Sequence, residues 1–153
     1  MEEIQLTIAE PYNFFMVSNN LNGMYGAETR YEEHSNLHTS MELLISRRLI
    51  EIGVPASLKG YRYMITAIEQ VVMDEAVLEG VTKVLYPEVA KKHHSTSQRV
   101  EKAIRHAIEV AWSRNDDCRL KEAFKYSANS GKSRPTNSEF IALLAQHIKT
   151  TLR

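Results

Sequence analysis

The chain has 153 residues, a formal net charge of zero and 43% hydrophobic residues. This length and composition allow one packed domain of ordinary size, and no apolar run approaches the roughly 20 residues of a membrane span. Cys118 is the single cysteine, which excludes an intramolecular disulfide, and no basic start leads into an apolar leader, so the sequence predicts a cytoplasmic protein.

Charge is unevenly distributed along the chain. Residues 1–82 carry 5 Lys and Arg against 12 Asp and Glu, a net charge of −7. Residues 83–134 carry 12 against 6, or +6, and residues 135–153 carry 2 against 1, or +1. Positive charge gathered in one segment of a neutral protein is what attraction to phosphate requires. The middle segment is therefore the candidate for a nucleic-acid site.

Residues 1–40 are predicted to form an N-terminal segment of their own. Apolar residues alternate at Ile4, Leu6 and Ile8, and residues 12–17 are again apolar and aromatic, which is typical of a β-hairpin. Because a lone hairpin is marginal in water, this segment docks on the following domain, pairs with another chain or stays partly flexible. Turn residues and a polar stretch follow, up to Ser40.

Two histidines of this polar stretch, His34 and His38, are four residues apart. Two imidazoles with one adjacent carboxylate, that of Glu33, fall short of the ligand set of a zinc site. We interpret both as solvated loop histidines. The sequence predicts no metal and no cofactor.

From Met41 onward the apolar residues recur with the period of α-helices. The first helix is predicted to begin after Ser40 as its N-cap and to end at Gly53, and the second to end near Gly80. These stripes indicate packing faces, with nothing catalytic implied.

Two further helices are predicted in the C-terminal part, a short one around Phe124 and a last one opened by Pro135 and Thr136. Glu139 stands three residues after Thr136, which completes a capping box. With the helix pair described next, residues 41–153 are predicted to be one all-α domain of about six helices.

The helix pair lies at residues 86–113. Pro87 suits the first turn of a short helix, His94 lies at a break, and Ser95 with Gln98 forms a capping box for a second helix, predicted at 96–113. One face of the second helix is apolar, formed by Val100, Ile104, Ala107, Ile108 and Ala111. The opposite face carries Gln98, Arg99, Lys102, Arg105, His106 and Glu109. This pattern is that of a helix-turn-helix or of an ordinary helical hairpin with a solvated face, and the gathered positive charge favours the first.

No catalytic set emerges from the sequence. The run Gly131-Lys132-Ser133 is similar to the end of a phosphate-binding loop, but such a loop needs a glycine where Tyr126 stands. The histidines around the helix pair have no nucleophile or carboxylate partner at a spacing that would dictate one. The sequence therefore predicts a binding protein without enzymatic activity.

Four sequence blocks carry a resemblance to a known family. They are EIGVPASLKGY at 51–61, TKVLYPEVAKK at 82–92, AIRHAIEVAWSR at 103–114 and RPTNSEFIA at 134–142. Together they resemble the C-terminal DNA-binding effector domain of the response regulator that commits endospore-forming bacteria to sporulation. The resemblance runs from about Met41 to the C-terminus and implies a sequence-specific transcription regulator that binds TGTCGAA-like promoter boxes.

Base contacts are expected from Gln98, Arg99, Glu101 and Lys102. Arg99 is the first choice, since a guanidinium can donate to both acceptors of a guanine, and the family's matching arginine contacts a guanine. Glu101 accepts from a cytosine amino group or else braces Arg99 or Arg105. Lys102 stands where the family usually has arginine, and Gln98 where it has a small polar residue. Phosphate contacts are expected from Lys59, Lys91, Lys92, Ser95, Thr96 and Arg105.

The resemblance also implies protein partners. The last helix is similar to the family surface through which two effector domains meet on tandem boxes, here Asn137, Ser138, Phe140 and Ile141. The family's contact with RNA polymerase sigma subunits follows Trp112, where only Phe124 and Tyr126 match.

Forty residues are too few for the family's phosphate-accepting receiver, and no aspartate precedes Asp74, so we expect DNA binding that is independent of aspartyl phosphorylation. The alternative is an interaction protein that pairs with a full-length regulator and blocks its productive dimerisation.

Overall fold

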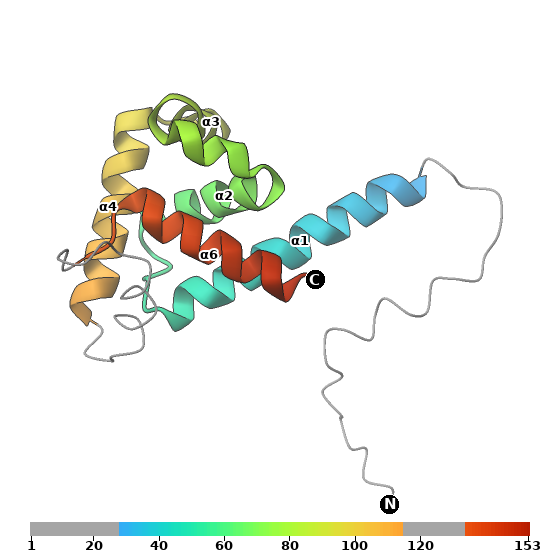
Figure 1. Cartoon of the computed structure of the whole chain (residues 1–153), viewed down its shortest axis with the longest axis horizontal. Coiled ribbons are helices and arrows are strands. Elements are labelled where there is room, and N and C mark those ends of the chain that lie inside the picture. The colour runs from blue at the N-terminus through green and yellow to red at the C-terminus, as the bar shows by residue number, and fades with distance from the viewer. Residues whose placement is uncertain (1–27, 115–133) are drawn as a thin grey trace, which may run out of the picture. The chain divides into compact units, whose positions relative to one another are not determined.

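The computed structural model describes residues 28–114 and 134–153, and within them all regular structure is helical (Figure 1). The elements are α1 (Glu28–Glu51), α2 (Lys59–Met73), the 3-10 helix η2 (Glu75–Gly80), the π-helix η3 (Val81–Leu85), α3 (Tyr86–Lys92), α4 (Ser97–Arg114) and α6 (Asn137–Thr151). The predicted all-α class is confirmed. The strands predicted in residues 4–17 and the helix near Phe124 lie outside the described residues.

Helix α1 begins at Glu28, thirteen residues before the predicted start. Residues 28–40 contain no glycine or proline that would interrupt a helix. The N-cap role of Ser40 and the loop setting of His34 and His38 were therefore wrong. The chain divides into two units, residues 1–35 and 36–153, and the predicted domain boundary after residue 40 stays a prediction.

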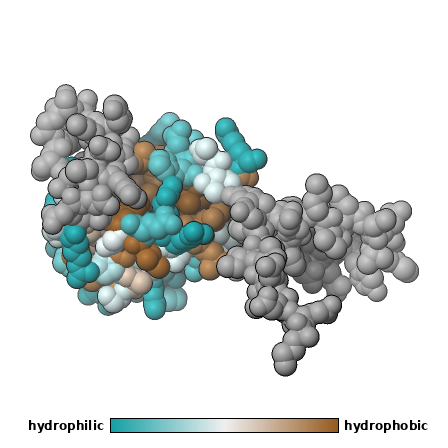
Figure 2. Space-filling view, turned by 90° about the horizontal axis from the view of Figure 1, so that it is seen from below, coloured by the Kyte–Doolittle hydropathy of each residue, from teal (hydrophilic) through white to brown (hydrophobic). Residues whose placement is uncertain are grey.

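The buried face of α1 lies in the part from Met41 onward, where the helical period was predicted. Met41, Ile45 and Leu49 are at most 2% exposed, spaced four residues apart along the helix. The helix ends at Glu51, two residues before the predicted stop at Gly53, whose φ of 90° lies in the left-handed region, with the Val54 N–H donating to the Leu49 carbonyl at 2.9 Å. Apolar residues also reach the surface, as Figure 2 shows for one face.

Helix α2 is the centre of the domain and packs against both α4 and α6. Its buried residues include Tyr61, Met64, Ala67 and Ile68. The predicted continuation to Gly80 is wrong, because Asp74 adopts an extended conformation and its carboxylate accepts the Ala76 N–H at 3.0 Å. A short side chain that binds the backbone in this way competes with the helix and begins η2 instead.

Helix α6 closes the core over α2 and α4 (Figure 1). It begins with the predicted capping box, in which the Thr136 hydroxyl accepts the Glu139 N–H and the Glu139 carboxylate accepts the Thr136 N–H. Its core residues are Phe140, Ile141, Leu144, Ala145 and Ile148, each at most 4% exposed.

Candidate nucleic-acid interface

Helices α3 and α4 form the predicted pair, joined by the four-residue turn 93–96. Helix α3 ends in a Schellman motif: the Ser95 N–H donates to the Ala90 carbonyl at 2.8 Å, and the His94 N–H to the Lys91 carbonyl at 3.4 Å. His94 takes the left-handed conformation that this motif requires, with φ of 50°. The predicted break at His94 is confirmed.

The N-cap of α4 is Thr96 rather than Ser95. The Thr96 hydroxyl accepts the Arg99 N–H at 3.3 Å, and α4 runs from Ser97 to Arg114, so each end lies one residue later than predicted. The N–H of Ser95 is bound to the end of α3, so the capping box predicted for Ser95 and Gln98 was wrong.

The two faces of α4 are as the periodicity predicted. Its apolar stripe is at most 1% exposed: Val100, Ile104, Ala107, Ile108 and Ala111. On the opposite face the side chains of Gln98, Arg99, Lys102, Arg105 and His106 are exposed, and Glu109 is half-buried. The exposed residues of this face therefore run from Gln98 to His106.

The charged groups on that face differ in what they already bind. Arg99 and Lys102 make no side-chain hydrogen bond or ion pair with the described residues. Glu101 and Arg105 pair with each other one turn apart, which is the bracing alternative for Glu101. Among the described groups, Arg99 and Lys102 can therefore meet a nucleic acid without first breaking an internal pair.

The predicted phosphate contacts lie around the turn. Lys91 and Thr96 are exposed, and Lys92 is exposed while its ammonium pairs with the Glu69 carboxylate at 3.3 Å. Lys59 opens α2 beside Gly60, whose backbone packs directly against Ala103 of α4. Lys59 itself is exposed.

His93 holds the turn against α2. Its ring Nε2 lies 2.8 Å from the Thr66 hydroxyl, and its ring meets Tyr63 edge-on with centroids 5.1 Å apart. Burial lowers the pKa of His93 below the ordinary 6.5, and the charges of Lys92 and Arg62 lower it further.

This lowered pKa gives stability a pH dependence. Above the unfolded-state pKa the contribution of His93 is complete. As pH falls below that value the unfolded chain takes up a proton before the native protein does, so the free energy of unfolding declines. The variant His93→Gln retains a polar partner for Thr66 but does not titrate. We expect its free energy of unfolding, measured in urea, to decline less than that of wild type between about pH 7.5 and about pH 5. Equal declines in the two proteins would contradict this role.

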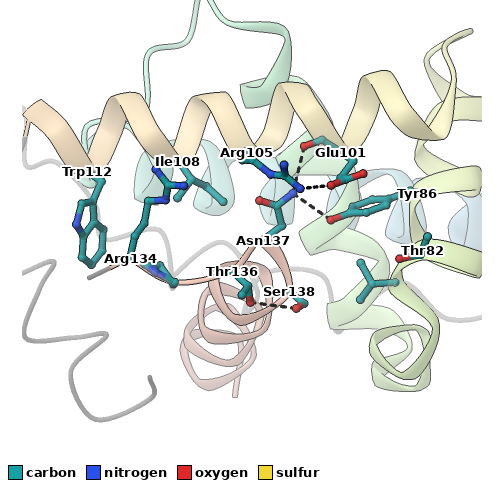
Figure 3. Close-up of a pocket in the computed structure, with 12 residues that line it drawn as sticks. Thr82, Tyr86, Glu101, Arg105, Ile108, Trp112, Arg134, Thr136, Asn137 and Ser138 are labelled. Carbon is teal, nitrogen blue, oxygen red and sulfur yellow. Dashed lines mark hydrogen bonds and ion pairs between the residues drawn. The ribbon is translucent and has the colours of Figure 1, made fainter. Parts of the chain in front are cut away.

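An open groove of about 800 Å³ lies between α4, η3 and the start of α6 (Figure 3). Asn137 of α6 points into it and donates its side-chain N–H groups to the Tyr86 hydroxyl at 3.1 Å and the Glu101 carbonyl at 3.2 Å. Burial raises the pKa of Tyr86, and the hydrogen bond from Asn137 acts against this rise. Arg134, just before α6, pairs with Glu109 at 2.9 Å. The start of α6 is thus tied to α4 at two points, two turns apart.

The predicted partner surface on α6 is only partly at the surface. Phe140 and Ile141 are 0% exposed, so their side chains belong to the core of this domain and offer nothing to a partner. Asn137 and Ser138 are half-buried at the start of the helix. The segment resembling the sigma-contact surface, with Phe124 and Tyr126, lies outside the described residues.

Sequence reasoning missed two features of this site, Gly60 and the Asn137–Tyr86 contact. The contact joins residues 51 apart in the chain, and no local pattern reports such a pair. For Gly60 a signal existed, since a glycine inside an apolar helical stripe often marks a close approach of two backbones.

The fold and the exposed basic face of α4 define a helical domain of the helix-turn-helix class. The chain belongs to the family described as sporulation initiation factor Spo0A C terminal, whose model matches residues 45–148. It thus carries a sporulation-related effector domain. The family is one of DNA-binding domains and not of enzymes. Within the described residues no helix is long and apolar enough to cross a membrane.

Proposed function

We propose that this protein is a sequence-specific DNA-binding transcription regulator that places the N-terminal half of α4 in the major groove. The observation that carries the proposal is the exposed pair Arg99 and Lys102, unengaged by other described residues, on a helix whose opposite face is wholly buried. Arg99 donates to a guanine, and Gln98 and Lys102 contact neighbouring bases. Glu101 holds Arg105 in place.

The phosphates on either side are bound by residues around the turn and at the start of α2. These are Lys59, Lys91, Lys92, Ser95, Thr96 and Arg105. Each neutralised phosphate adds to the salt dependence of binding without adding sequence preference. Two copies meet on tandem sites through the exposed part of α6 around Ser138, and the protein acts in the cytoplasm.

DNA binding by this chain is independent of aspartyl phosphorylation. Supporting this, no aspartate occurs among residues 1–73 of this sequence. Wild type is therefore expected to bind its site equally with and without acetyl phosphate. A requirement for acetyl phosphate or a kinase would contradict this part of the proposal.

Arg99→Ala tests base reading most simply. With a duplex enriched from a random pool by wild type, we expect the substitution to cost about 1–3 kcal/mol on that duplex and little on a scrambled one. Fluorescence anisotropy over a salt series measures both affinities. Arg114→Ala is the matched control, because it removes the same charge from the far end of the same helix, about 22 Å away.

Three outcomes decide the matter. A loss confined to the enriched duplex and to Arg99→Ala supports base reading by α4. Equal binding of both duplexes by wild type, with a steep salt slope, would mean phosphate binding without sequence preference. Absence of binding to any duplex would favour the alternative of an interaction protein that pairs with a full-length regulator.

A further inference from the structure

The first residue of α6 contacts both helices of the pair through its side chain. Asn137, the first residue of α6, donates hydrogen bonds from its side-chain amide to two other helices: to the Tyr86 hydroxyl of α3 and to the Glu101 backbone carbonyl of α4. The three residues come from three helices and meet beside the groove (Figure 3).

Each partner is itself fixed. Tyr86 is 5% exposed and lies at the start of α3. Asn137 is held by the capping box that begins α6 one residue earlier. The Glu101 carbonyl lies in the second turn of α4. In the sequence Glu101 lies between Arg99 and Lys102, the two exposed residues proposed to contact bases. The bond from Asn137 therefore constrains the part of α4 that carries the proposed base contacts.

We propose that Asn137 is a positioning residue for base reading: its amide locks the Glu101 turn of α4 to α3 and α6 and so sets where Arg99 and Lys102 lie in the groove of the DNA. This rests on the proposed function of α4. Because a bidentate contact to a base edge tolerates little displacement, loss of the lock lowers discrimination between sequences more than it lowers attraction to phosphate. This role replaces the partner contact first predicted for Asn137.

The test uses the full chain and the variant Asn137→Asp. The carboxylate has the shape of the amide and suits a helix N-terminus, so the fold is retained, but it cannot donate to the Glu101 carbonyl. Gln146→Glu makes the same chemical change at an exposed position further along α6. Affinities for the enriched and scrambled duplexes are measured for both variants, with thermal unfolding to verify the fold.

We expect the ratio of the two affinities to fall about tenfold in Asn137→Asp and to stay unchanged in Gln146→Glu. Tyr86→Phe, which removes one of the two acceptors, is expected to give a smaller fall in the same direction. A role confined to global stability would lower both affinities together and leave the ratio unchanged. An unchanged ratio in Asn137→Asp would therefore overturn the inference.

A second readout separates this inference from the proposed function. In free protein, the amide NMR signals of residues 101–105 are expected to shift in Asn137→Asp and not in Gln146→Glu. Those signals could shift while wild type binds both duplexes with equal affinity and with the same affinities as Arg99→Ala. In that case base reading by α4 is what fails. If wild type prefers its duplex while the signals stay in place, the positioning role of Asn137 is what fails.

Discussion

Replacing Gly60 by alanine is expected to lower the free energy of unfolding by about 3 kcal/mol. A Cβ at this position would lie 2.0 Å from the Ala103 carbonyl oxygen and 2.6 Å from its carbon. Both are backbone atoms of α4, which cannot turn aside as a flexible side chain would. The added methyl group must therefore push α2 and α4 apart along their contact.

Gly80→Ala is the control for this substitution. There an added Cβ meets the Val84 Cγ2 atom at 3.0 Å, the far end of a side chain that is 44% exposed. We expect a change within about 0.5 kcal/mol. Urea unfolding followed by circular dichroism measures both variants. Similar values for the two glycines would mean that α2 and α4 do not approach as closely as described.

Phe140→Ala is expected to cost about 3–5 kcal/mol, the largest effect of any substitution considered, because the ring is fully buried and its removal leaves a cavity. The same measurement decides between the two roles of Phe140, core residue and partner contact. Gln146→Ala, at an exposed position of the same helix, is expected to change stability by less than about 0.5 kcal/mol.

A surface role for Phe140 makes the opposite prediction. In that case Phe140→Ala would retain wild-type stability and lose only the paired binding of two copies to a tandem duplex. Analytical ultracentrifugation with tandem and single-site duplexes, run beside the unfolding experiment, distinguishes the two results.

The sequence predicted those elements whose signals are local and agree with one another. In α4 an apolar stripe of five residues begins soon after the break at His94. In α6 the apolar stripe follows a complete capping box formed by Thr136 and Glu139. Period and boundary signals come from neighbouring residues there. Helix α4 lies within one residue of its predicted bounds, and α6 begins within two residues of its predicted start.

Prediction failed where one residue supports two structures. Ser40 is a good N-cap and also an acceptable exposed helix residue, and continuation of the helix from Glu28 decides between them. Asp74 is tolerated within a helix and equally able to end one, and the bond from Ala76 to its carboxylate decides that case. At Ser95 the competing structure is α3, whose last turn takes its N–H.

The candidate site was predictable in its residues and not in its connections. Periodicity alone placed Arg99 and Lys102 on the exposed face of α4. The Arg105–Glu101 pair, four residues apart on α4, is one of the alternatives predicted for Glu101. That Phe140 is core, and that Asn137 reaches both Tyr86 and α4, depend on how α6 lies over the helix pair. Such contacts are tertiary, and no local pattern in the chain encodes them.

The most direct test of the account is an amide NMR titration of the protein with its enriched duplex. We expect the largest perturbations in the turn 93–96 and in the first two turns of α4, including Arg99 and Lys102, with a smaller change at Lys59. Helix η2 and the described part of α1 should be unaffected. Perturbations centred on η2 or α1, with the signals of Arg99 and Lys102 unchanged, would contradict the claim that α4 reads DNA.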